Sequence, residues 1–338
     1  MAEKIEYHSI SNKGSTATIS LKGGVVTSWT VPSGEVAFDV IDGYATDEEV
    51  TEGNGARSAI LAPWSNRIRD SRYQWNGVSY DLGPDEDGVR DGLHGLFVGR
   101  DFQLIEAGPN WALLQSEVGA DELGESYEEG KLAYPAALKV TVRYQLDFLQ
   151  QRWQLGIRVN VQNLGSEVAP IALGWHPYIR YDGPRAQSSI TMRARTQVRI
   201  DEGKIPLDGP EAFEPAEGWD EESGVLTLSA PQDLDRAYTD LTTTTGVEAT
   251  SSAFLNHASG ATTEVRASVA GSGKRGSGVF HVFTGEGLAH RVRESVAIEF
   301  CRFMPNIMNR PEFAQEISVE PNKSRTMDVY LIHTPPQK

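Results

Sequence analysis

The chain has 338 residues and a formal net charge of −16, with 47 acidic and 31 basic side chains. Its overall field repels nucleic-acid phosphates and anionic membrane surfaces, so neither is an expected partner. The single cysteine, Cys301, excludes an intrachain disulfide and a zinc motif built from cysteines, and we expect a buried structural thiol. No run approaches the roughly 18 to 20 apolar residues of a membrane span and the first residues carry no apolar signal-peptide core, so we expect a cytoplasmic protein.

The first part of the chain predicts hairpins. Residues 16–21 and 25–29 alternate between apolar and polar side chains on either side of a Gly-Gly pair. Residues 72–82 alternate in the same way around an Asn-Gly pair, which supplies the positive φ angles of a tight turn. Residues 45–55, between these hairpins, are polar and acidic and predict a loop.

The remaining periodic segments also predict strands. Alternation with a period of two recurs over residues 111–117, 138–148, 153–161 and 317–332. Hardly any segment has helical periodicity, and 33 glycines and 17 prolines suit a chain with many turns. The sequence therefore predicts an all-β fold, a large antiparallel β-sandwich, in a single domain over residues 1–338.

Metal and phosphate sites are not expected from the motifs present. The acidic runs at 47–49, 85–87 and 220–222 predict solvated loops, because metal ligands must converge in space. No pair of histidines has the HxH or HxxxH spacing. The glycine-rich stretch 271–276 departs from the phosphate-loop spacing and precedes a strand pattern, so it predicts a mobile turn. We expect neither a metal ion nor a cofactor.

Four ionisable side chains interrupt apolar or turn-defined surroundings, namely His94, His176, Asp235 and Glu299. A histidine in such a place is more often a hydrogen-bonded structural residue than a catalytic one. Glu299 stands inside the apolar strand pattern 296–301, where an unpaired buried charge would be costly. From the pattern alone, Glu299 could lie either on an exposed face of the strand or in a functional site.

Five motifs in order carry a resemblance to a known family. They are PWxNRI at 63–68, RYxWxGxxYxL at 72–82, LHG at 93–95, GWHPY at 174–178, and Glu299 ahead of Pro305-Asn306. In this order they resemble the aldose 1-epimerase (mutarotase) family over nearly the whole chain. The resemblance implies the galactose mutarotase-like supersandwich and a small-molecule sugar as partner, bound by a monomer or homodimer.

The resemblance also implies roles for particular residues. Glu299 would take the proton of the anomeric hydroxyl and His176 would protonate the ring oxygen, with His94 polarising or orienting that oxygen. Arg67, Asn66 and Asp235 would hold sugar hydroxyls, although Asp233, two residues before Asp235, stays an alternative. An apolar face for the ring would come from one of three aromatic residues whose more ordinary use is core packing: Trp64, Trp175 or Phe97.

Departures from the family leave the substrate open. The segment 300–304 is largely apolar where many relatives carry a polar segment, and Glu320-Pro321-Asn322 replaces a Pro-Gly turn. A phosphorylated hexose is an alternative, since guanidinium groups suit phosphate. The arginines concerned, more simply surface residues, are Arg69, Arg90, Arg100 and Arg180. A non-catalytic carbohydrate-binding protein and a glycoside-cleaving enzyme with Glu299 and Asp235 as its carboxylates are further alternatives.

Overall fold

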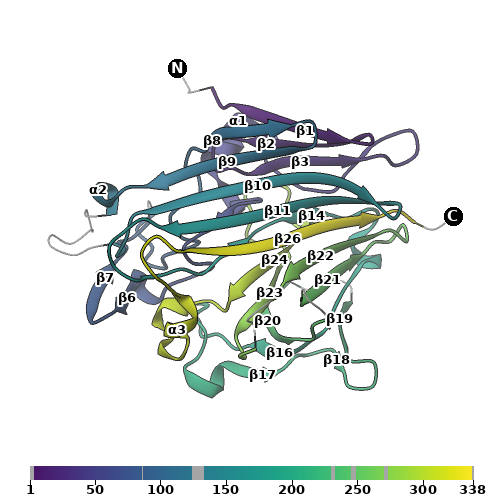
Figure 1. Cartoon of the computed structure of the whole chain (residues 1–338). Coiled ribbons are helices and arrows are strands. Elements are labelled where there is room, and N and C mark those ends of the chain that lie inside the picture. Colours follow the sequence, from purple (N-terminus) through teal and green to yellow (C-terminus); the bar gives the residue numbers. More distant parts are fainter. Residues whose placement is uncertain are drawn as a thin grey trace.

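The period-two segments form the strands of two large antiparallel sheets in the computed structural model (Figure 1). The structure describes residues 4–85, 87–123, 133–229, 233–244, 249–269 and 273–336. Two predicted turn or loop regions, 85–87 and 271–276, lie partly outside these ranges. Within them, no helix is both long and apolar enough to cross a bilayer.

Ten strands of the described chain form the larger sheet. Their spatial order is β18 (Trp219–Asp220), β19 (Val225–Ser229), β15 (Ser189–Met192), β21 (Thr250–Asn256), β22 (Thr262–Ser268), β26 (Ser324–Thr334), β11 (Arg152–Asn163), β10 (Leu138–Leu149), β9 (Trp111–Val118) and β8 (Gln103–Gly108). In β10 every second side chain from Leu138 to Leu146 is buried. This alternation puts one apolar face of the sheet against the core, as the sequence predicts.

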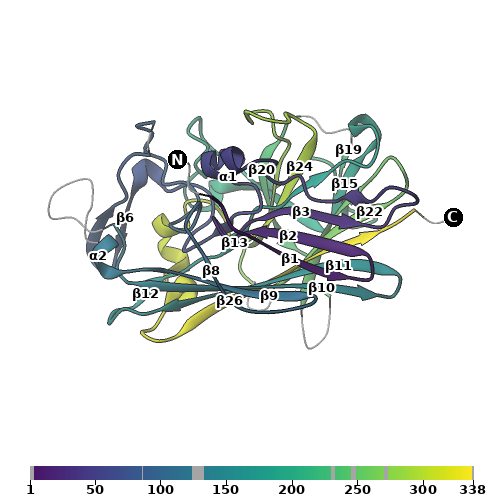
Figure 2. The same ribbon diagram turned by 90° about the horizontal axis from the view of Figure 1, so that it is seen from above.

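The smaller sheet has eight strands among the described residues. Seven follow the order β17 (Phe213–Pro215), β16 (Ala194–Val198), β20 (Asp235–Leu241), β23 (Ser277–Phe283), β24 (Ser295–Phe303), β13 (Gly174–Trp175) and β5 (Ile60–Leu61), and β14 (Tyr178–Arg180) also pairs with β24. From Ser295 to Cys301 every residue of β24 is buried. Seen from above, β20 and β24 lie along one side of the molecule and β9, β10 and β26 along the other (Figure 2).

Smaller sheets cover the ends of this sandwich. A four-stranded sheet contains β1 (Tyr7–Asn12), β2 (Ser15–Ser20), β3 (Val26–Val31) and β4 (Phe38–Asp39), and two further pairs are β6 (Arg72–Trp75) with β7 (Val78–Asp81) and β12 (Ala169–Pro170) with β25 (Ser318–Val319). Both predicted hairpins are therefore confirmed. In the turn between β6 and β7, Asn76 and Gly77 have the expected positive φ angles of 48° and 79°.

Helices are short throughout the described chain. The α-helices are α1 (Asp47–Glu52), α2 (Ala120–Leu123) and α3 (Ala314–Ile317), and the 3-10 helices are η1 (Asn54–Ala56), η2 (Arg69–Ser71), η3 (Arg185–Gln187), η4 (Gly209–Ala212), η5 (Ile307–Asn309) and η6 (Pro311–Phe313).

The prediction that residues 45–55 form only a loop is wrong, because α1 lies within them. The Thr46 hydroxyl accepts a hydrogen bond from the Glu49 amide at 3.3 Å, and the Glu49 carboxylate accepts one from the Ala45 amide at 3.0 Å. This reciprocal capping satisfies amides at the start of the helix.

Candidate functional site

A pocket of about 410 Å³ opens beside β20, β23 and β24 of the smaller sheet. Loops from distant parts of the chain complete its walls. The polar side chains that line it are Asn66, Arg67, His94, His176, Tyr178, Lys204, Asp235, His281, Glu286 and Glu299. The sequence-predicted residues Asn66, Arg67, His94, His176, Asp235 and Glu299 thus meet in one place.

Glu299 and His176 form the most buried ionisable pair in this pocket. Glu299 lies in the middle of β24 and is 2% exposed, and its Oε1 is 3.3 Å from Nε2 of His176. His176 occupies the turn between β13 and β14, both of which pair with β24. Burial lowers the pKa of His176 below its usual value, against the opposing effect of the Glu299 charge.

His94 is a neutral imidazole with a defined tautomer. The Asn66 amide donates to Nδ1 of His94 at 3.2 Å, so Nδ1 is unprotonated and Nε2 carries the hydrogen. Burial, and then the nearby His176 and Arg67, hold the pKa of His94 well below its usual range. The ring of His94 meets that of His176 edge-on, with centroids 5.2 Å apart. His94 can therefore donate a hydrogen bond but not act as a cation near neutral pH.

The structure explains why the LHG motif has a glycine at position 95. Gly95 has a φ of 86°, and a Cβ added there would lie 2.1 Å from the Ala62 carbonyl oxygen. The Leu96 amide donates to that same carbonyl at 2.7 Å. Only glycine fits this close approach, which places His94 beside the segment that carries Asn66 and Arg67.

Asp235 is the aspartate at the pocket, and Asp233 is not among the residues that line it. Oδ1 of Asp235 is 2.8 Å from Nε2 of His281, and Oδ2 is 2.6 Å from Nζ of Lys204. Burial alone would raise the pKa of Asp235, but these two partners outweigh it and hold the pKa below its usual value. Asp233 instead forms an exposed ion pair with Arg293.

Trp175, expected from the resemblance to bind substrate, is not among the residues that line the pocket. Trp175 is fully buried, and its indole nitrogen donates to the Ser58 carbonyl at 3.0 Å. Neighbouring side chains of an extended chain point to opposite sides, so a pocket-facing His176 turns Trp175 toward the core. Trp64 and Phe97 are likewise buried in the core.

The aromatic and apolar surface of the pocket comes from other residues. Tyr178 stacks on His176 with ring centroids 5.0 Å apart and an interplanar angle of 18°. Phe283, Leu288, Leu93 and Val98 also line the pocket. These side chains can cover one face of a small ring.

Sequence reasoning missed His281 and Lys204. His281 interrupts the apolar strand β23 in the same manner as Glu299 interrupts β24, so its signal was present. Lys204 lies in a loop, and its ion pair with Asp235 holds its side chain at the pocket. Arg67, which was predicted, lines the pocket with its Nε 3.2 Å from the Asp91 carboxylate.

The four other arginines considered for phosphate binding are not among the residues that line the pocket, and each has a carboxylate partner. The pairs are Arg69 with Asp201, Arg90 with Asp81, Arg100 with Glu122, and Arg180 with Asp42.

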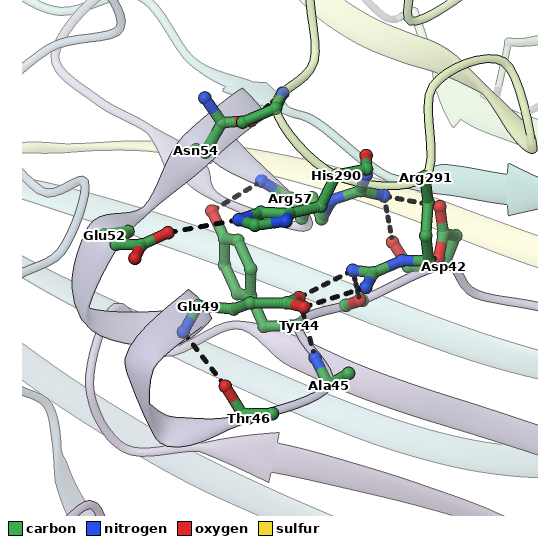
Figure 3. A network of polar contacts seen from close by, with 12 residues as sticks. Asp42, Tyr44, Ala45, Thr46, Glu49, Glu52, Asn54, Arg57, His290 and Arg291 are labelled. Carbon is green, nitrogen blue, oxygen red and sulfur yellow. Dashed lines mark hydrogen bonds and ion pairs between the residues drawn. The ribbon is translucent and has the colours of Figure 1, made fainter.

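A buried ionic network fixes the pocket rim (Figure 3). Asp42 is fully buried and binds Arg57 and Arg291, and Arg291 also forms two hydrogen bonds of 2.9 and 2.7 Å with Glu49 of α1. Arg57 donates to the His290 carbonyl at 2.9 Å, and its guanidinium carbon lies 4.8 Å from the centroid of the Tyr178 ring. These contacts tie α1 and the segment 285–291 to the wall that carries His176.

Two further side-chain observations bear on the chemistry. Cys301 is buried in β24, and burial raises the pKa of its thiol well above the usual value, as expected of a structural cysteine. In the part of the chain that the structure describes, no group of three or more His, Cys, Asp or Glu side chains is arranged to hold a metal ion. The pocket offers one buried acid–base pair, a neutral imidazole donor and a set of paired charges.

Known proteins show the same architecture. The GalM/aldose epimerase homologue from Caenorhabditis elegans superposes with a TM-score of 0.79 at 19% identity, covering 99% of this chain and 100% of that one. A galactose mutarotase-like protein from Clostridium acetobutylicum gives a TM-score of 0.73 at 14% identity, covering 98% of both chains. The predicted galactose mutarotase-like sandwich is thus confirmed.

The alignments with sequence relatives cover only part of each chain. The chain is 32% identical over 120 residues to YihR of Escherichia coli K12, a protein described as uncharacterized, and 25% identical over 202 residues to the aldose 1-epimerase of the same organism. These alignments cover 36% and 59% of this chain but only 35% and 55% of the two relatives. The sequence model described as Aldose 1-epimerase matches residues 6–330, and the chain belongs to the aldose 1-epimerase family.

Proposed function

We propose that the protein is an aldose 1-epimerase that interconverts the α and β anomers of a hexose or a related sugar. The observation that carries this proposal is the buried contact between Glu299 and His176 in a pocket of about 410 Å³. Anomer exchange needs one base and one acid at neighbouring oxygens of the same sugar carbon. Family membership supports the same reaction class.

In the proposed mechanism, Glu299 removes the proton from the hydroxyl on C1 while His176 delivers a proton to the ring oxygen. The bond between C1 and the ring oxygen breaks, and C1 becomes a carbonyl carbon. After rotation about the C1–C2 bond, the carbonyl presents its other face to the hydroxyl formed from the ring oxygen. His176 then takes the proton back, Glu299 returns a proton to O1, and the ring closes as the other anomer.

The remaining pocket residues orient the sugar. The Nε2 hydrogen of His94 can donate to the ring oxygen, because the Asn66 amide occupies Nδ1. Arg67 and Asn66 line the same wall and can donate to sugar hydroxyls. Tyr178 and Phe283 supply apolar contact for the ring.

Two alternatives receive less support from the site. For a phosphorylated hexose, the pocket offers Arg67 and Lys204, and both cations already have carboxylate partners. Glycoside cleavage would need a second carboxyl able to act beside Glu299. Asp235 is held in its charged form by His281 and Lys204, which leaves it poorly suited to donate a proton.

The proposal is tested by adding the purified protein to freshly dissolved α-glucose, α-galactose and their 6-phosphates. Polarimetry and proton NMR follow the approach to anomeric equilibrium, with the Glu299→Gln variant as the control. We expect faster exchange of at least one neutral hexose than in the presence of the variant. Binding of a sugar without any acceleration would instead support the non-catalytic alternative, and cleavage of a glycoside would overturn the proposal.

A further inference from the structure

Carboxylates and imidazoles alternate across neighbouring segments at the floor of the pocket. β23 lies between β20 and β24, and His281 of β23 stands opposite Glu299 in the register of that pair. Across the other edge of β23, His281 stands opposite Ala237, two residues after Asp235. Side chains two residues apart share a face, so Asp235, His281 and Glu299 point to the same side of the sheet.

Both oxygens of Asp235 already accept hydrogen bonds from protein side chains. His281 contacts Oδ1 at 2.8 Å, and Lys204 contacts Oδ2 at 2.6 Å. Each contact is a charge-assisted hydrogen bond when its donor is protonated, and such bonds are stronger than neutral ones. Each carboxylate oxygen keeps a second lone pair that a sugar hydroxyl can use, but the position of the Asp235 carboxylate is set by His281 and Lys204.

The surroundings of His281 favour its protonated form. Burial alone would lower the pKa of His281, but the charges of Glu299 and Asp235 outweigh burial and raise the pKa above its usual value. Arg67 opposes this effect, and the neighbouring imidazoles His94 and His176 both have lowered pKa values. Lys204, bound to the other oxygen of Asp235, is a second cation near His281 and also opposes its protonation. Of the three pocket imidazoles, His281 is the one whose pKa is raised.

We propose, on the basis of the proposed anomerase function, that His281 is a positioning residue of the reaction. Asp235 holds His281 as a cation beside Glu299, and this cation places a positive charge next to the proposed base. Asp235 therefore acts on the reaction through His281, in addition to any hydrogen bond that it accepts from a sugar hydroxyl.

The first test needs no turnover. The imidazole of His281 is assigned by NMR from the signal that disappears in His281→Gln, and its titration is followed in the wild type, Asp235→Asn and Glu299→Gln. We expect His281 to titrate above pH 6.5, the usual value for histidine, in the wild type and at lower pH in both variants. Asp233→Asn, two residues from Asp235 and outside the pocket lining, is the matched control and leaves the titration unchanged.

Titration of His281 at or below the usual value in the wild type, or no change in either variant, would overturn the inference. These outcomes are independent of anomerase activity, so they separate failure of the inference from failure of the proposed function. The titration of His281 can be measured even if His281→Gln is too unstable for kinetics. The signal of His281 is then assigned by selective histidine labelling, with Asp235→Asn and with variants of the other histidines.

The second test is kinetic. His281→Gln keeps a donor toward Asp235 but removes the charge beside Glu299. We expect kcat to fall by about 10-fold while KM changes little, and the pH profile of kcat/KM to change, because the titrating charge beside the proposed base is lost. His8→Gln on β1 controls for the substitution itself. An unchanged pH profile in His281→Gln, with Glu299→Gln inactive, would refute the role of His281 and leave the proposed function standing.

Discussion

Nε2 of His176 lies 3.3 Å from Oε1 of Glu299, and the sheet fixes this distance. Trp175 pairs with Phe300 and Tyr178 pairs with Ala297, so backbone hydrogen bonding on both sides of His176 holds it against β24. The proposed acid and base are thus positioned by rigid elements before a sugar enters. Such preorganisation reduces the entropy that the reaction must lose.

The first prediction concerns this pair. Glu299→Gln and His176→Asn should each lower kcat by about 10²- to 10⁴-fold, the usual contribution of general acid–base catalysis. The double variant should be little slower than either single variant, because residues that act as a unit are not additive. The measurement is the rate of anomer exchange by NMR, made on protein shown to be folded by circular dichroism.

A buried carboxylate in the other sheet supplies the control for that prediction. Glu264 of β22 is 5% exposed and bonded to Arg266, and it does not line the pocket. Glu264→Gln should leave kcat per folded molecule unchanged even if it lowers stability. Equal losses of kcat in Glu264→Gln and Glu299→Gln would show that burial of charge, rather than the pocket chemistry, explains the effect.

The second prediction separates Asp235 from Asp233. Asp235→Asn should lower kcat/KM by about 10- to 100-fold, since it weakens charge-assisted hydrogen bonds of roughly 1.5 to 3 kcal/mol each. Asp233→Asn should stay within about twofold, because an exposed ion pair such as that with Arg293 contributes little. Initial-rate kinetics on both variants provide the comparison. A larger loss in Asp233→Asn would contradict the placement of Asp235 as the functional aspartate.

Local periodicity was sufficient to predict the strands and much of the site. Alternation marks β10, the apolar run around Glu299 marks β24, and the five ordered motifs identify His94, His176 and Arg67. These features depend on residues close in sequence or on a family pattern, so they can be read without coordinates. The same alternation turns the side chain of Trp175 to the side away from His176, which is the reason that Trp175 is buried and does not line the pocket.

The remaining features depend on tertiary contacts. Lys204 is held at the pocket by its ion pair with Asp235, which no local pattern encodes. The distinction between Asp233 and Asp235 rests on where β20 begins, because Asp235 is the first residue of β20 and pairs with β23, whereas Asp233 precedes the strand. His281 had a visible signal, but its relation to Glu299 appears only when β23 and β24 lie side by side (Figure 1).

The third prediction concerns the network in Figure 3. Asp42 is fully buried and bonded to Arg57, Arg180, Arg291 and Ser295. Asp42→Asn should lower the free energy of unfolding by about 3 to 5 kcal/mol, because it leaves buried guanidinium charge uncompensated. Urea unfolding at pH 7 measures the loss.

A surface carboxylate provides the contrast for Asp42. Asp328 pairs with Arg158, whose side chain is 61% exposed. Asp328→Asn should cost no more than about 1 kcal/mol, the usual range for an exposed pair. Similar losses in the two variants would mean that the network around Asp42 contributes no more than an ordinary surface contact.

The fourth prediction is the pH dependence of the contact between α1 and the pocket rim. Hydrogen bonds from Arg291 lower the pKa of Glu49 to about 2, against the opposing effect of burial. A carboxyl whose folded-state pKa is lowered stabilises the protein above its unfolded-state pKa, near 4.5 here, and loses that contribution as pH falls toward 2. Glu49→Gln should therefore be less stable than the wild type at pH 7, and this difference should shrink between about pH 4.5 and pH 2.

Urea unfolding of both proteins across this range measures the difference directly. The control is Glu48→Gln, a change at an exposed neighbour, whose free energy of unfolding should stay within about 0.5 kcal/mol of the wild type at every pH. A difference that is absent at pH 7, or that persists undiminished at pH 2, would show that the ionised Glu49 does not hold α1 to Arg291.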